Sequence, residues 1–238
     1  MRDTKIVATL GPASTSEEVL RDMIRAGVNV VRINFSHGTA QEHIDRVNTV
    51  RKIAEEEGIH IGVLADLQGP KIRISKFEDK SVFLANGSTF VFDKQADVPG
   101  DASRVGLDFP DLIKDVHAGD ILLLDDGKIR MRVENNTGDA LECIVEQGGK
   151  LSDRKGINKL GGGLSAAALT AKDMADILVA AQFQTDFLAV SFPRRRAEMY
   201  MARELLRNAG GDALLIAKIE RAEAIPNLEE ILEASDGL

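Results

Sequence analysis

Polar and charged side chains interrupt an apolar segment at residues 30–38, which reads VVRINFSHG. The apolar residues alternate there with Arg32, Asn34 and Ser36, as in a strand that has one face in the core. A guanidinium, an amide and a hydroxyl on the other face indicate that this face meets either water or a binding site. An arginine in such a site is suited to binding phosphate or carboxylate.

Three later apolar segments also end in side chains that could do chemistry. These side chains are Asp66, followed by Arg73, then Ser191, and then Lys218 with Glu220. In a parallel barrel the carboxyl ends of all strands meet on one face, where active sites are built. We therefore expect these side chains to converge with Arg32 on a single face.

The grouping indicates electrostatic and metal-assisted chemistry. Arg32, Arg73 and Lys218 would form a positive patch for phosphate or carboxylate. Glu220 and Asp66 carry the oxygen ligands that Mg²⁺ prefers. Lys218 and Glu220 are two residues apart, so both should lie on the same face of a strand. The sequence holds no HExxH motif and no cysteine–histidine pair, which disfavours nucleophilic catalysis.

Each of these residues also has a structural interpretation. Arg32 alone could form an ion pair within the fold, and Lys218 with Glu220 could be a solvated strand end. His37 is expected to be a turn residue or a helix-start ligand. Cys143 is expected to be a small core residue. The other histidines are expected at the surface: His43, His60 and His117.

Strand and helix patterns alternate along residues 1–70 and again along residues 164–238. The expected strands are 4–10, 28–36, 59–69, 185–193 and 213–220, and the expected helices are 15–27, 40–57, 170–182, 195–209 and 223–235. Capping boxes are expected at Thr15 with Glu18 and at Thr39 with Glu42. Five strands joined by helices predict parallel βα units.

Residues 71–163 have a different pattern, with short alternating strands and little helix. Asn86-Gly87, Asp126-Gly127 and Gly148-Gly149 separate these strands as turns. The glycines at 161–163 are expected to serve as a hinge.

We predict an α/β fold: a partial (β/α)8 TIM barrel, strands 1–5, with an inserted all-β domain at 71–163. Residues 1–70 would be the first part of the barrel, and residues 164–238 its continuation, ending before strand six. A doubly wound sheet is the competing fold, but the turn LGPAST lacks the glycine-rich GxGxxG pattern.

Composition narrows the class of protein. The formal net charge is −8 and the basic residues form no long block, so neither nucleic acid nor a membrane surface is an expected partner. The single cysteine fits a reducing compartment, and no segment approaches the roughly 20 apolar residues of a membrane span. We expect a soluble cytoplasmic protein.

Eight motifs follow one another in the order found in one enzyme family. They are KIVATLGPAS, VVRINFSHG, DLQGPKIR, LLLDDG, KGINKLGGG, LTAKD, LAVSFPR and IAKIERAEAIPN. The chain resembles the N-terminal half of the pyruvate kinases, bacterial type. The resemblance implies a (β/α)8 A domain, a β-stranded B domain that closes over its mouth, and a homotetrameric parent enzyme. It also implies phosphoryl transfer from phosphoenolpyruvate to ADP, giving ATP and pyruvate, with Mg²⁺ or Mn²⁺.

The resemblance also implies roles for single residues. Arg32 would hold the transferring phosphoryl group, and Lys218 would stabilise charge in the transition state. Arg73 would contact the nucleotide phosphates, and Glu220 would bind magnesium. The nucleotide-side segment would be Asn34, Phe35, Ser36 and His37.

The sequence departs from the family pattern where potassium-dependent members bind the ion. Leu67 and Lys71 stand where those members have threonine and glutamate. The ammonium group of Lys71 would replace K⁺, with Asn34, Ser36 and Asp66 as remnants of its shell, so K⁺ should not be required.

Two further expectations concern the chain as a whole. Because the motif for the second magnesium carboxylate is missing, the 238-residue chain alone is expected to be inactive. The alternatives are a Mg²⁺-dependent carbon–carbon lyase or aldolase acting on pyruvate-like substrates, and a non-catalytic binding remnant.

Overall fold

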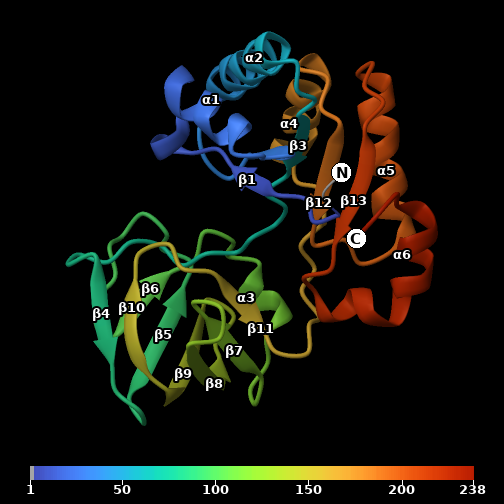
Figure 1. Cartoon of the computed structure of the whole chain (residues 1–238). Helices are drawn as coiled ribbons and strands as arrows, with labels where there is room; N and C mark the ends of the chain where they lie inside the picture. The colour runs from blue at the N-terminus through green and yellow to red at the C-terminus, as the bar shows by residue number, and fades with distance from the viewer. Residues whose placement is uncertain (1–2) are drawn as a thin grey trace. The chain divides into compact units, whose positions relative to one another are not determined.

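The computed structural model describes residues 3–238, which divide into two compact units (Figure 1). The first unit combines the chain up to Pro70 with Ala167–Leu238, and the second unit is Lys71–Ala166. The second unit therefore ends three residues after the expected C-terminal limit of the insertion, residue 163. No helix within residues 3–238 is long and apolar enough to cross a membrane.

The first unit is built on a parallel five-stranded sheet with the order β1-β2-β3-β12-β13. Its strands are β1 (Val7–Thr9), β2 (Val30–Asn34), β3 (Gly62–Asp66), β12 (Phe187–Ser191) and β13 (Leu214–Lys218). Its helices are α1 (Glu17–Arg25), α2 (Ala40–Glu57), α4 (Ala171–Gln182), α5 (Arg196–Asn208) and α6 (Leu228–Ala234), with short 3₁₀ helices η1 (Pro12–Ser14) and η2 (Ala222–Asn227). The strands follow one another across the sheet without the reversal of a doubly wound fold, as in part of a barrel.

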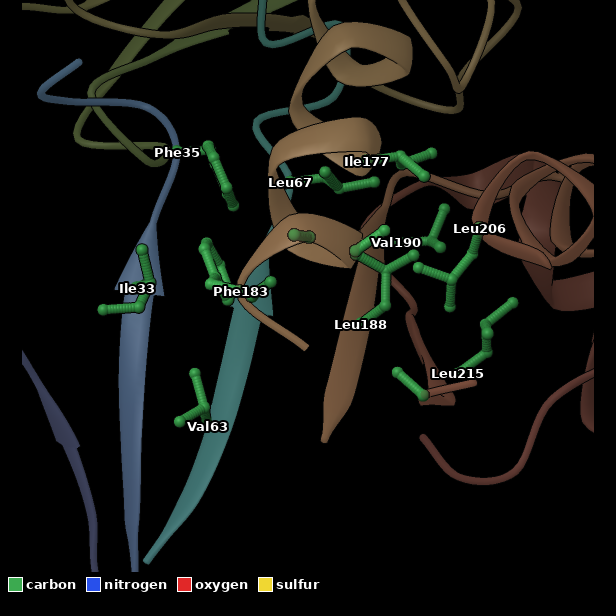
Figure 2. Close-up of a cluster of buried hydrophobic side chains, with 14 of the residues drawn as sticks. Ile33, Phe35, Val63, Leu67, Ile177, Phe183, Leu188, Val190, Leu206 and Leu215 are labelled. Carbon is green, nitrogen blue, oxygen red and sulfur yellow. The ribbon is translucent and has the colours of Figure 1, made fainter. Parts of the chain in front are cut away.

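Alternation along the strands separates the core of this unit from its site. Every second residue is buried against the helices, and Figure 2 shows Ile33, Val63 and Leu188 in the same cluster as Phe183, which directly follows α4. Because successive side chains point to opposite faces of a sheet, Arg32 and Asp66 lie on the face away from these helices.

The predicted N-terminal cap of α2 is confirmed, and the predicted cap of α1 is not. Thr39 caps α2, and its backbone N–H donates to Glu42 Oε2 at 2.6 Å, which confirms that capping box. The cap of α1 is Ser16, whose hydroxyl accepts from Val19 N, so the prediction of Thr15 was wrong by one residue. Thr15 instead ends η1 and donates to Pro12 O at 3.3 Å.

The single helix predicted at 223–235 is two elements. Residues Ala222–Asn227 form η2, which contains Pro226, and α6 begins at Leu228. Proline has no backbone N–H and its ring crowds the preceding turn, so a regular α-helix starts only after it.

The second unit consists mainly of antiparallel strands. They are β4 (Ser81–Leu84), β5 (Thr89–Asp93), β6 (Arg104–Gly106), β7 (Ile121–Leu124), β8 (Ile129–Asn136), β9 (Ala140–Gln147), β10 (Gly149–Ser152) and β11 (Ile157–Lys159), with one short helix, α3 (Leu112–Asp115). β10 pairs with β4, and the other strands form a sheet in the order β11-β7-β8-β9-β5-β6. Cys143 is 1% exposed within the core of this unit, as predicted.

Candidate active site

A buried carboxylate lies between two cations at the strand ends of the first unit. Asp66, at the end of β3, is 3% exposed. Its Oδ2 accepts from Arg32 Nε at 2.7 Å, and its Oδ1 accepts from Lys218 Nζ at 3.0 Å. Both oxygens of the carboxylate are therefore held by positive groups, and a metal ion would have to compete with them.

The register of the parallel strands brings these side chains together. Asn34 of β2 is opposite Asp66, and Ser191 of β12 is opposite Lys218. Lys218 Nζ donates to Ser191 Oγ at 2.8 Å, while that hydroxyl donates to the carbonyl of Leu67 at 2.7 Å. The hydroxyl thus has a fixed direction, with its oxygen turned to the ammonium group.

Sequence reasoning missed one contact of Arg32. Its Nη1 donates to Thr9 Oγ1 at 2.9 Å, at the end of β1. A polar residue at the end of the first strand was the available signal. The Arg32 side chain keeps 30% of its surface exposed, so the ion pair with Asp66 does not remove it from solvent.

Glu220 is the remaining carboxylate near Lys218. Its Oε1 lies 3.5 Å from Lys218 Nζ, and its side chain is 34% exposed. Among residues 3–238, no group of three or more histidine, cysteine, aspartate and glutamate side chains is arranged to hold a metal ion. Asp66 is already held by two cations. Among the described residues, Glu220 is therefore the carboxylate that would bind a divalent cation beside Lys218.

The turn after β2, here called the β2 turn (Asn34–Gly38), buries Phe35 and exposes Gly38. Asn34 Oδ1 accepts from Ser36 N at 3.0 Å. Phe35 is 2% exposed as a whole residue, its ring belongs to the core (Figure 2) and its N–H donates to the carbonyl of Asp66 at 3.0 Å, so a ligand could meet this turn at Ser36, His37 and Gly38 rather than at Phe35. His37 is exposed.

His43 is buried, which corrects the expectation of a surface position. It is 1% exposed, and within the described residues neither ring nitrogen has a hydrogen-bond partner. Burial, and next the charge of Arg46, lower the pKa of His43 below its ordinary value. The signal was present, because His43 is at helical spacing from the buried Val47 and Val50.

The other predicted site residues, Lys71 and Arg73, belong to the second unit. Arg73 N donates to Asp108 Oδ1 at 2.7 Å, and Arg73 Nη1 donates to the carbonyl of Arg154 at 3.1 Å. Arg73, Asp108 and Arg154 line a cavity of about 430 Å³ in this unit. Burial raises the pKa of Asp108. Lys71 packs against Gly156, where a Cβ would lie 3.3 Å from Lys71 Cε.

A parallel sheet whose strands follow one another in chain order, with an arginine and a lysine gathered at the strand ends, is typical of the α/β-barrel class of enzymes. The sequence model of the family described as "Pyruvate kinase, barrel domain" matches residues 1–238. The chain belongs to the pyruvate kinase family.

Named relatives cover the whole chain. The pyruvate kinase of Haemophilus influenzae is 51% identical over 242 residues, which cover 99% of this chain and 50% of the relative. Pyruvate kinase II of Salmonella typhimurium is 50% identical, covering 99% and 50%. The pyruvate kinase of Staphylococcus haemolyticus is 40% identical, covering 100% and 41%. The chain spans about half the length or less of these curated relatives.

Proposed function

We propose that this chain acts in the transfer of the phosphoryl group of phosphoenolpyruvate to ADP, which yields ATP and pyruvate. The observation that carries the proposal is the buried Asp66 between Arg32 and Lys218 at the strand ends of a chain of this family. Phosphoryl transfer needs positioning and charge neutralisation more than covalent help, and these side chains supply charge.

The two cations would act on the transferring group. Arg32 and Lys218 share the carboxylate of Asp66, and a second carboxylate, Glu220, lies 3.5 Å from Lys218 Nζ. Arg32 would hold the phosphoryl group, since a guanidinium forms paired bonds to phosphate oxygens. Lys218, oriented by Ser191, would stabilise the charge that develops in the transition state.

Glu220 would hold a divalent cation, Mg²⁺ or alternatively Mn²⁺. This assignment follows from the neighbours of the carboxylates, because Asp66 is engaged by two cations and Glu220 has Lys218 at 3.5 Å. When bound, the ion supplies positive charge beside the phosphate oxygens. Glu220 would also hold the Lys218 ammonium group on the side of the substrate.

The second unit would be the nucleotide lid, a β-stranded B domain inserted into the barrel. Arg73 would meet the nucleotide phosphates, and the β2 turn would bind the nucleotide from the first unit. Gly161, Gly162 and Gly163 all have left-handed backbone angles, with φ between +81° and +87°, which favours a hinge at this end of the unit. Closure of the lid would exclude water from the transfer.

The proposed function also has consequences for the potassium requirement, the oligomeric state and the localisation of the whole protein. Lys71 would take the place of the potassium ion, so K⁺ would not be required. The whole protein would be a cytoplasmic homotetramer that binds neither nucleic acid nor membrane.

A coupled assay tests the proposal with protein expressed from its complete gene. We expect pyruvate and ATP to form in equal amounts from phosphoenolpyruvate and ADP, and only with a divalent cation present. Pyruvate released from a larger keto acid without nucleotide would instead identify a lyase or aldolase. Nucleotide binding with no turnover would identify a non-catalytic binding protein.

A further inference from the structure

A lysine on α4, to which the proposed reaction assigns no role, donates a hydrogen bond to the backbone of the β2 turn. Lys172, on α4, donates from its Nζ to the carbonyl oxygen of Phe35 at 2.7 Å. The same ammonium group pairs with Asp176 Oδ2 at 2.5 Å and lies 5.8 Å from the centroid of the Phe35 ring. The two residues are 137 positions apart in the chain, so this contact exists only in the folded unit.

His43 supports the same turn from α2. Its ring meets the Phe35 ring edge-on, with the centroids 4.7 Å apart. It also lies directly under Gly38, where a Cβ would come within 3.2 Å of His43 Cε1, and the φ of Gly38 is +82°. Phe35 is therefore held through its ring by His43 and through its carbonyl by Lys172.

These contacts fix the peptide unit between Phe35 and Ser36. The Phe35 carbonyl oxygen is bound on the helix side, while Ser36 N donates to Asn34 Oδ1. A peptide unit anchored in this way cannot rotate freely. A binding loop that is already ordered loses less conformational entropy when its ligand arrives, so its affinity is higher.

We propose that Lys172 is a positioning residue that preorders the β2 turn and thereby sets the affinity for the nucleoside diphosphate. The inference rests on the proposed function, in which this turn binds the nucleotide. Lys172 acts through the Phe35 carbonyl, and Asp176 keeps its ammonium group in place. The transition-state contacts of Arg32 and Lys218 are independent of it.

Hydrogen exchange tests the positioning step on this chain without any turnover. Lys172→Met removes the ammonium group and keeps most of the stem, so the amides of residues 36–38 should exchange at least several times faster. Lys172→Arg can still donate to the carbonyl and should restore slow exchange. The matched control is Lys52→Met, because Lys52, like Lys172, pairs with a carboxylate (Glu17 Oε1 at 3.1 Å), but it lies on another helix, in the C-terminal half of α2.

Steady-state kinetics on the protein from its complete gene tests the nucleotide step. Lys172→Met should raise KM for ADP about tenfold, or about 1.4 kcal/mol, with KM for phosphoenolpyruvate and kcat within about twofold of wild type. Lys172→Arg should return KM for ADP close to the wild-type value. A merely structural lysine would move both KM values and kcat together.

Two results would overturn the inference: unchanged exchange at residues 36–38 in Lys172→Met, or faster exchange there with an unchanged KM for ADP. If the wild-type protein forms no pyruvate at all, the proposed function fails. Binding of ADP to wild type and Lys172→Met, measured by calorimetry, then decides the inference. A weaker affinity in the variant supports it, and equal affinity or no binding to either contradicts it.

Discussion

The Asp66 carboxylate organises the site at the level of single residues. It is nearly inaccessible to solvent, while the Arg32 and Lys218 side chains that it holds are each 30% exposed. The carboxylate thus stays in place while the cations can reach a ligand. Its removal would leave two positive groups side by side, and each would turn toward water.

We predict that Asp66→Asn lowers the free energy of unfolding by about 1–3 kcal/mol, the usual cost of losing charged hydrogen bonds to a buried group. The partial exposure of both cations keeps the loss below that of a fully buried pair. Urea unfolding measures it. The control Asp45→Asn, at an exposed position on α2, should cost less than about 0.5 kcal/mol. Equal losses for the two variants would show that Asp66 is not the organising group.

His43 should make stability depend on pH. Its folded pKa lies below the ordinary value of about 6.5 because the ring is buried, so the unfolded chain takes up the proton first. The stabilising contribution of the neutral ring is complete above pH of about 6.5 and is lost as the pH falls toward the folded pKa. The free energy of unfolding between pH 7.5 and 5.5 should therefore fall more for wild type than for His43→Leu. An equal fall would mean that the folded ring accepts a proton freely.

At the scale of elements, close approach between strand ends constrains the backbone. Gly69, three residues after β3, has φ +64°, and its N–H donates to Asp173 Oδ1 at 3.0 Å. A Cβ on Gly69 would meet Phe192 Cδ2 at 2.7 Å and Ser191 Cβ at 2.8 Å. The glycine therefore allows the chain to leave the sheet directly beside the Ser191 that orients Lys218.

Gly69→Ala should destabilise the chain more than Gly58→Ala. Both glycines are left-handed, with φ +64° and +66°, but a Cβ on Gly58 would meet nothing within 4 Å. Both substitutions put an alanine at a left-handed φ and so carry a similar conformational cost. The difference between the two losses in the free energy of unfolding therefore measures the steric clash of the Gly69 Cβ with Phe192 and Ser191, about 1–3 kcal/mol. Thermal or urea unfolding of both variants measures it. Losses of the same size would show that β3 and β12 separate without cost at this point.

The elements were largely predictable and the cross-chain contacts were not. The bounds of α2 follow from its capping box at Thr39 and the glycine at its end, which are local signals. The site face of β2 follows from alternation. The bond from Lys172 to Phe35 joins residues that have no local relation in the sequence, and no pattern marks it. The boundary between η2 and α6 could have been predicted from Pro226, because proline disfavours the interior of an α-helix.

On the scale of the whole molecule, two compact units divide the chain, and the predicted site residues are shared between them. Arg32, Asp66, Lys218 and Glu220 belong to the first unit, while Lys71 and Arg73 belong to the second. Leu67, which stands where potassium-dependent relatives are expected to have a threonine, is 2% exposed and packs in the core of the first unit (Figure 2). An apolar side chain directed into the core cannot donate an oxygen to a cation.

We therefore expect turnover of the protein from its complete gene to persist in buffer free of K⁺, with less than about twofold activation when K⁺ is added. The ammonium group of Lys71 would already supply the positive charge. Lys71→Glu reverses this charge and should create a dependence on K⁺ of about tenfold or more, the size expected for about 1.4 kcal/mol. Strong activation of the wild-type protein by K⁺ would contradict this role for Lys71.

The central claim is that the cations at the strand ends perform phosphoryl transfer, and the kcat of Lys218→Met tests it most directly. The measurement is ADP-dependent pyruvate formation by protein expressed from its complete gene, beside wild type and the Lys52→Met control. Loss of one preorganised positive group at the reacting phosphate should lower kcat about 10²–10³-fold, with a folded protein and a nearly unchanged KM for ADP. A Lys218→Met protein that turns over within about threefold of the control would contradict the account.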